Sequence, residues 1–171
     1  MDYHNKNIMY NGKFLSVIKR DGWEYVQRNT NTGDVVSITA ITKDNEIILV
    51  EQYRIPVDCY VIENPAGLLG DINKNETPIE CAKKELLEET GYISNNWEYV
   101  FTTPKSPGLI SECSIHFIAR DCEKIEDGGG VDNEKILVHK VQLDNIRNYF
   151  KELKDNNILV SSGIYAGLYF I

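Results

Sequence analysis

The segment spanning residues 70–92, GDINKNETPIECAKKELLEETGY, contains a helix whose two ends are both marked by the sequence. Thr77 suits the N-cap position, and Glu80 completes a capping box with it. Gly91 suits the position just past the last turn, where the backbone turns left-handed. The pattern therefore predicts a helix over residues 77–90.

Glutamates crowd one side of this predicted helix. An apolar stripe is expected to face the core, and Glu85, Glu88 and Glu89 project from the neighbouring stripe. Exposed carboxylates at this spacing repel one another, and the negative end of the helix dipole adds to that repulsion. We expect them to converge without basic partners. Two interpretations stay open: a solvated acidic face, or a site for a hard cation such as Mg²⁺ or Mn²⁺, which carboxylate oxygens attract.

The charge balance narrows the range of partners. The chain has 171 residues and a formal net charge of -8, whereas non-specific nucleic-acid binding needs a basic surface. We expect no nucleic-acid partner, and an anionic small substrate would need a bridging cation. No apolar run has the length of a membrane span, and the N-terminus lacks the apolar core of a signal peptide. The sequence therefore predicts no membrane partner and a cytoplasmic location.

The cysteines show no metal or disulfide pattern. They form no CxxC pair and have no histidine partners at zinc spacing. Reduced thiols are the expectation for all of them: Cys59, Cys81, Cys113 and Cys122.

Strand patterns dominate on both sides of the central helix. Residues 35–53 indicate two β-branched strands joined by a turn at 43–45, and residues 13–30 indicate an earlier hairpin that turns at Asp21-Gly22. Further strands are predicted at 97–103, 114–121 and 135–141, and further helices at 143–154 and 161–170. This order favours a mixed α/β sandwich, in which the residues before about 35 form a small separate sheet.

The whole segment resembles the Nudix box, a fixed series of glycine, glutamate, arginine-glutamate, apolar, glutamate-glutamate and glycine positions. The matching residues are Gly70, Glu76, Lys84-Glu85, Leu86, Glu88-Glu89, Gly91 and Tyr92. One position departs from the family pattern, because Lys84 stands where the family has arginine. A lysine cannot make the bidentate contacts of an arginine, so the departure predicts lowered turnover.

The resemblance extends to the ADP-ribose and ADP-sugar pyrophosphatase branch of this family. EQYRIPVDCYVIENPAGLLGD resembles the segment before the box in that branch, and SPGLISE, GWEYVQR and VDNEKILVHKV resemble three of its other segments. The resemblance implies a Nudix-type mixed-sheet α/β/α sandwich over residues 35–171, with a small N-terminal β-sheet extension over 1–34. It also implies a homodimer in which the extension can exchange between subunits.

The resemblance implies a metal site on the central helix. By this likeness Glu85, Glu88 and Glu89 hold Mg²⁺ or Mn²⁺, and the carbonyl of Ala66 adds a backbone ligand. Small residues at Ala66-Gly67 would let the backbone approach the ion closely, although the same residues also suit a plain tight turn.

The catalytic base implied by the resemblance is Glu134, in the glycine-rich loop DGGGVDNE. Glu112 is the alternative base, and Glu88 is counted among the catalytic carboxylates as well as the metal ligands. A surface glutamate without a catalytic role is the competing interpretation of Glu134.

Substrate contacts follow from the same likeness. Arg54 and Arg28 are expected to bind phosphate oxygens, Trp23 to stack on adenine, Glu63 to contact ribose or the metal shell, and Gly108 to contact substrate. Either arginine could instead form a structural ion pair, and the tryptophan could instead lie in the core.

Together these features predict metal-dependent hydrolysis of the diphosphate bond of ADP-ribose, or of a related ADP-sugar, to AMP and a sugar phosphate. The alternatives are hydrolysis of another nucleoside diphosphate sugar such as GDP-mannose, and a non-catalytic ligand-binding module of the same fold.

Overall fold

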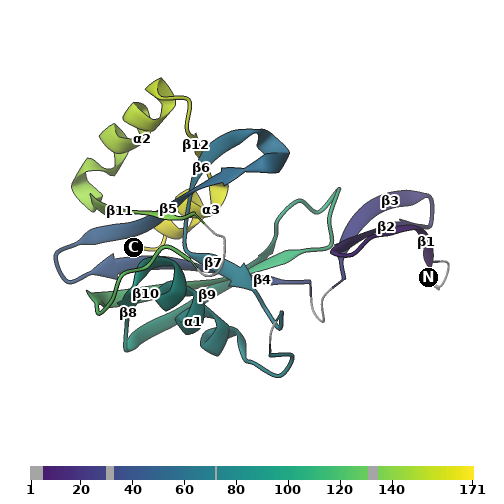
Figure 1. Ribbon diagram of the computed structural model, residues 1–171, viewed down its shortest axis with the longest axis horizontal. Helices are drawn as coiled ribbons and strands as arrows, with labels where there is room; N and C mark the ends of the chain where they lie inside the picture. The colour runs from purple at the N-terminus through teal and green to yellow at the C-terminus, as the bar shows by residue number, and fades with distance from the viewer. Residues whose placement is uncertain (1–5, 30–32, 72, 131–134) are drawn as a thin grey trace.

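A large mixed sheet forms the centre of the protein, and a small sheet projects from one end of it (Figure 1). The computed structural model describes residues 6–29, 33–71, 73–130 and 135–171. Within these ranges the small sheet has three strands and the large sheet has nine.

The small sheet holds β1 (Lys6–Asn11), β2 (Leu15–Arg20) and β3 (Trp23–Arg28). The large sheet holds β4 (Val35–Thr42), β5 (Glu46–Arg54), β6 (Cys59–Glu63), β7 (Ala66–Leu68), β8 (Tyr92–Ile93), β9 (Asn96–Pro104), β10 (Cys113–Lys124), β11 (Leu137–Gln142) and β12 (Leu159–Val160). The helices are α1 (Pro78–Thr90), α2 (Ile146–Asp155) and α3 (Ser162–Leu168), with short 3-10 turns η1 (Ile55–Val57) and η2 (Leu143–Asn145).

Strand β4 lies at the centre of the large sheet, antiparallel to β5 and parallel to β10. Successive side chains of a strand point to opposite faces, so β5 contributes Ile48 to one core and Ile47 and Leu49 to the other. Leu86 of α1 packs in the first core, and Ile164 of α3 packs in the second, beside α2. Helices therefore cover both faces, which confirms the predicted mixed-sheet α/β/α sandwich.

Helix α1 begins and ends where the sequence predicts. The Thr77 N–H donates to the Glu80 carboxylate at 2.8 Å, and the Glu80 N–H donates to the Thr77 hydroxyl at 3.4 Å. The donated backbone hydrogen bond lowers the pKa of Glu80. Gly91 closes the helix at φ 76°, with its N–H donating to the Leu87 carbonyl at 2.7 Å. Two ends fixed in this way set which residues of α1 face the sheet.

The small sheet is bonded to the main body through the loop between β9 and β10. The Val26 N–H donates to the Leu109 carbonyl at 2.8 Å, and the Ser111 N–H donates to the Val26 carbonyl at 3.0 Å. The predicted hairpin is present, with Asp21 and Gly22 at its turn. A division into two domains at residue 34 and a role in dimerisation stay predictions.

All four cysteines are free thiols, as expected. Burial raises the pKa of Cys81 and of Cys122 to about 12, so neither is a reactive thiolate at neutral pH. In the part of the chain that the structure describes, no helix is both long and apolar enough to cross a membrane.

A buried histidine lies where α3 meets the sheet. His116 on β10 is 1% exposed, stacks on Phe101 with 4.8 Å between ring centroids, and lies 2.9 Å from the Thr39 hydroxyl. Burial, with a smaller contribution from the Lys105 charge, lowers the pKa of this imidazole from 6.5 to about 4.

This histidine should make stability depend on pH. Between pH 6.5 and about 4 the unfolded chain binds a proton that folded His116 does not, so its contribution is complete above pH 6.5 and is lost as the pH falls. We expect urea unfolding to show a steeper loss of free energy from about pH 7 to about pH 5 in the parent than in His116→Gln. Parallel pH profiles would contradict this assignment.

Candidate active site

A cavity of about 680 Å³ opens between α1, the β5–β6 hairpin, β7 and the base of the β9–β10 loop. This size is typical of sites for small molecules. Its described lining carries four cationic and six acidic side chains. They are Arg28, Arg54, Lys84 and Lys105, and Glu63, Asp71, Glu85, Glu88, Glu89 and Glu112.

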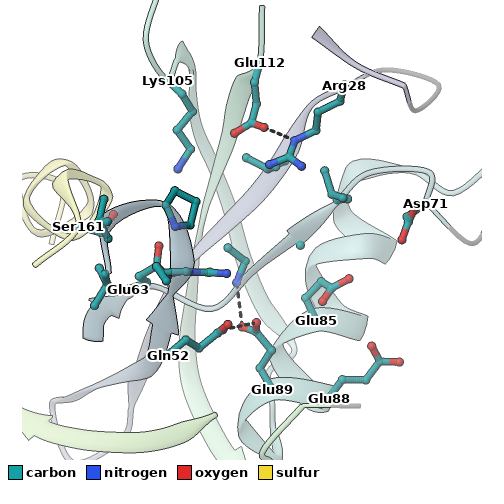
Figure 2. Close-up of a pocket in the computed structure, with 18 of the residues that line it drawn as sticks. Arg28, Gln52, Glu63, Asp71, Glu85, Glu88, Glu89, Lys105, Glu112 and Ser161 are labelled. Atoms are coloured by element: carbon teal, nitrogen blue, oxygen red, sulfur yellow. Dashed lines mark hydrogen bonds and ion pairs between the residues drawn. The ribbon is translucent and has the colours of Figure 1, made fainter. Parts of the chain in front are cut away.

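Glu89 is the carboxylate that the fold positions most firmly. Its side chain belongs to α1 and the residue is only 6% exposed. The backbone N–H of Ala66 in β7 donates to one carboxylate oxygen at 3.0 Å, and the Gln52 amide donates to the other at 3.3 Å (Figure 2). Buried carboxylates need such donors, so strands β5 and β7 together fix where this charge lies.

Glu85 lies one helical turn before Glu89 and packs against the backbone of Gly67. A Cβ atom at residue 67 would overlap the Glu85 carboxyl group, so glycine is what lets this carboxyl group lie against the strand. The Lys84 ammonium lies 3.1 Å from a Glu85 oxygen. The expectation that the acidic stripe lacks basic partners is therefore wrong for Glu85, because the flexible lysine stem reaches its own neighbour. Burial lowers the pKa of Lys84, but the bond and charge of Glu85 outweigh it and raise the pKa overall.

Glu88 differs from the other two glutamates of the stripe. It lines the cavity, but Figure 2 shows its carboxylate directed away from that of Glu89. Among the described residues, no group of three or more His, Cys, Asp or Glu is placed to hold a metal ion alone. Glu85 and Glu89 are instead a pair facing the cavity. Mg²⁺ commonly binds through one or two carboxylates together with substrate phosphates, so this pair fits such an ion.

Two further residues of the box, Gly70 and Glu76, are joined by a hydrogen bond that the sequence analysis did not predict. Gly70 adopts φ 75°, and its N–H donates to the Glu76 carboxylate at 2.9 Å. This bond closes the loop that leads from β7 into α1, and so helps to position the helix against the strand that holds Ala66.

The glycine-rich loop is attached to the end of the same helix. The N–H groups of Gly129 and Gly130 donate to the carbonyls of Glu89 and Glu88, at 2.9 and 3.1 Å. These carbonyls have no partner within a helix, so the loop satisfies them. Glu134, the predicted base, lies outside the described residues.

The predicted phosphate-binding arginines are both in ion pairs at the cavity wall. Arg28 pairs with Glu112, and the Arg54 Nε lies 2.5 Å from a Glu63 oxygen. Each arginine therefore forms the ion pair that the sequence analysis gave as its alternative role. The two arginines and their two glutamates all line the cavity. The lining also includes residues that the sequence analysis did not single out, among them Gln52, Asp71, Lys105 and Ser161.

Trp23 and Gly108 lie together but outside the cavity lining. The tryptophan is 61% exposed, and its indole N–H donates to the Gly108 carbonyl at 3.2 Å. The alternative that placed Trp23 in the core is therefore wrong. Its stacking on a nucleobase stays a prediction.

The contact between Gly67 and Glu85 can be tested directly. In Gly67→Ala the new methyl group meets the flexible end of Glu85, which can move without unfolding the strand. We expect the free energy of unfolding to change by less than about 1 kcal/mol, while the affinity for Mn²⁺ falls about tenfold or more. Gly108→Ala is the control, because that position faces open space. Calorimetric Mn²⁺ titrations with equal affinities would refute the role of this contact.

Comparison with known proteins finds a matching family model and several relatives. A family model described as the NUDIX domain matches residues 31–156. A GDP-mannose pyrophosphatase of Cronobacter sakazakii is 34% identical over 145 residues, which cover 78% of this chain and 71% of that protein. A methanol dehydrogenase activator of Bacillus methanolicus is 36% identical over 118 residues, covering 68% of this chain and 62% of the relative. An ADP-ribose pyrophosphatase of Bacillus subtilis is 32% identical over 102 residues, which cover 60% of this chain and 54% of that protein.

The alignments with these relatives thus span between 54% and 71% of their own lengths. In three dimensions the chain resembles the crystal structure of an ADP compounds hydrolase, with a TM-score of 0.70 over 87% of this chain and 82% of that one. At 20% identity this likeness concerns the fold. The matched domain covers more than half of the sequence, and the chain belongs to the NUDIX family.

Proposed function

We propose that this protein is a pyrophosphohydrolase that cleaves the diphosphate bond of a nucleoside diphosphate sugar with the help of a divalent cation. The observation that carries the proposal is the buried Glu89 carboxylate, held by the Ala66 N–H beside Glu85 at one wall of a cavity of substrate size. ADP-ribose is the first candidate substrate, and the products would be AMP and a sugar phosphate.

The residues that would hold Mg²⁺ or Mn²⁺ are Glu85 and Glu89, with the Ala66 carbonyl as a further ligand. Glu88 would join them after its carboxylate turns toward the pair. When bound, the cation supplies Lewis-acid polarisation of the diphosphate and makes a nearby water more acidic. The chain prepares the site in advance, because Ala66 and Gln52 already fix the Glu89 carboxylate. Such preorganisation avoids the cost of ordering a charged group during the reaction.

The cationic part of the lining would orient the substrate. Arg28 and Arg54 each keep guanidinium donors beyond the Nε that contacts its glutamate, and those donors can take phosphate oxygens. Glu63 would hold the Arg54 side chain in place and contact ribose. Trp23 would stack on the nucleobase, in its own subunit or across the expected homodimer.

Proton removal from the attacking water is assigned to Glu134. The described part of its loop is bonded to α1 at Glu88 and Glu89, which are the residues beside which a base is needed. Glu112 is the rival, but its carboxylate is already paired with Arg28.

GDP-mannose is the second candidate substrate, because a relative of that activity aligns with 78% of the chain. A module that binds ligand without turnover is the third possibility, and the Lys84–Glu85 pair is the feature that favours it. Release of phosphomonoester from a panel of nucleotide sugars, with and without Mg²⁺, decides among the three.

Neutralising either carboxylate of the facing pair should abolish turnover. We expect Glu85→Gln and Glu89→Gln to lower kcat/KM on the order of 100-fold or more while circular dichroism shows the fold intact. Glu98→Gln is the matched control, because Glu98 is exposed on β9 outside the cavity lining. If both Glu85→Gln and Glu89→Gln keep the parental activity, the metal site does not lie at this wall of the cavity.

The base can be identified from pH profiles. Glu134→Gln should lower kcat at least about tenfold and remove the acidic limb of the pH–rate profile. Glu112→Gln should keep that limb, since its expected role is to hold Arg28. If the limb disappears in Glu112→Gln instead, the base is Glu112.

A further inference from the structure

The cationic side chains of the cavity differ in whether a carboxylate already neutralises them. Arg28 is paired with Glu112, Arg54 with Glu63 at 2.5 Å, and Lys84 with Glu85 at 3.1 Å. The fourth cation is Lys105. Its ammonium makes no hydrogen bond or ion pair with any residue that the structure describes.

The position of Lys105 explains why its ammonium has no partner in the described part of the chain. Its backbone N–H donates to the Glu112 carbonyl at 3.0 Å, so the two residues face each other at the base of the β9–β10 loop. The nearby Glu112 carboxylate is held by Arg28 from the small sheet. The contact between the sheets thus takes away the acid that Lys105 would otherwise pair with.

Lys105 also lies far from the acidic helix. Figure 2 shows its side chain at the opposite side of the cavity from Glu88 and Glu89, on the same side as Ser161. The lining as a whole has more acids than bases, and the chain carries a net charge of -8. A diphosphate that enters therefore meets, at Lys105, a cation that no carboxylate among the described residues neutralises.

We propose that Lys105 is a substrate-binding residue that contacts a phosphoryl oxygen of the substrate diphosphate on the side away from α1. The inference rests on the proposed function. An arginine in an ion pair must share its charge with a carboxylate, whereas the ammonium of Lys105 gives its full charge to the incoming anion. This contact exists before and during the reaction, so it lowers KM and leaves kcat unchanged.

Three variants test this role. Lys105→Gln removes the charge, Lys105→Arg keeps it, and Lys43→Gln is the control, because Lys43 pairs with Glu123 in a separate cavity. With ADP-ribose and Mg²⁺ we expect Lys105→Gln to raise KM about tenfold with kcat within about twofold. Lys105→Arg should restore KM, and Lys43→Gln should match the parent. An unchanged KM, or a loss confined to kcat, overturns the proposal.

Calorimetric titration with inorganic pyrophosphate, without metal, separates this inference from the proposed function. Pyrophosphate has the charge that Lys105 would recognise but neither base nor sugar. We expect Lys105→Gln to bind it about tenfold more weakly than the parent and Lys43→Gln. If the parent hydrolyses no nucleotide sugar yet this difference appears, the proposed function fails and the Lys105 site stands. Equal binding in all variants, or no binding by the parent, overturns the site.

Discussion

The hydrogen bond from the Ala66 N–H to the Glu89 carboxylate is the contact on which the rest of the site depends. It joins the short strand β7 to helix α1, and it satisfies a charge that is almost fully buried. An unpaired buried carboxylate would cost several kcal/mol. The close approach of Gly67 to Glu85 is part of the same junction, since a side chain there would displace the second carboxylate.

The family motif, residues 70–92, thus contains residues that position helix α1 as well as the carboxylates that line the cavity. Gly70 and Glu76 close the loop before α1. Gly91 ends the helix and packs against the backbone at Glu126. Between these fixed ends, the partly buried Glu85 and the buried Glu89 line the cavity. The glycine-rich loop then bonds to the last carbonyls of α1, which brings the segment preceding Glu134 to the helix that carries the acids.

Short-range sequence patterns predicted those helices and strands whose formation depends mainly on residues close together in the chain. The capping box and Gly91 placed α1 to within one residue, and β-branched runs with turn residues located β4 and β5. The short strand β7 carries no pattern of its own, and it forms where β4 pairs with it. An ion pair was an open alternative for Arg28, but its partner could not be predicted, because Arg28 and Glu112 are 84 positions apart and meet through the packing of two sheets. The ion pair between Lys84 and Glu85 could have been predicted, because the two residues are adjacent in the sequence.

In the proposed function, Glu85 and Glu89 hold a divalent cation against a diphosphate. Crystals grown with Mn²⁺ and a non-hydrolysable ADP-ribose analogue test it most directly, because Mn²⁺ gives an anomalous signal. We expect an anomalous peak between these two carboxylates and the phosphates of the analogue. A bound analogue whose phosphates lie away from this wall, with no peak beside either glutamate, would contradict it.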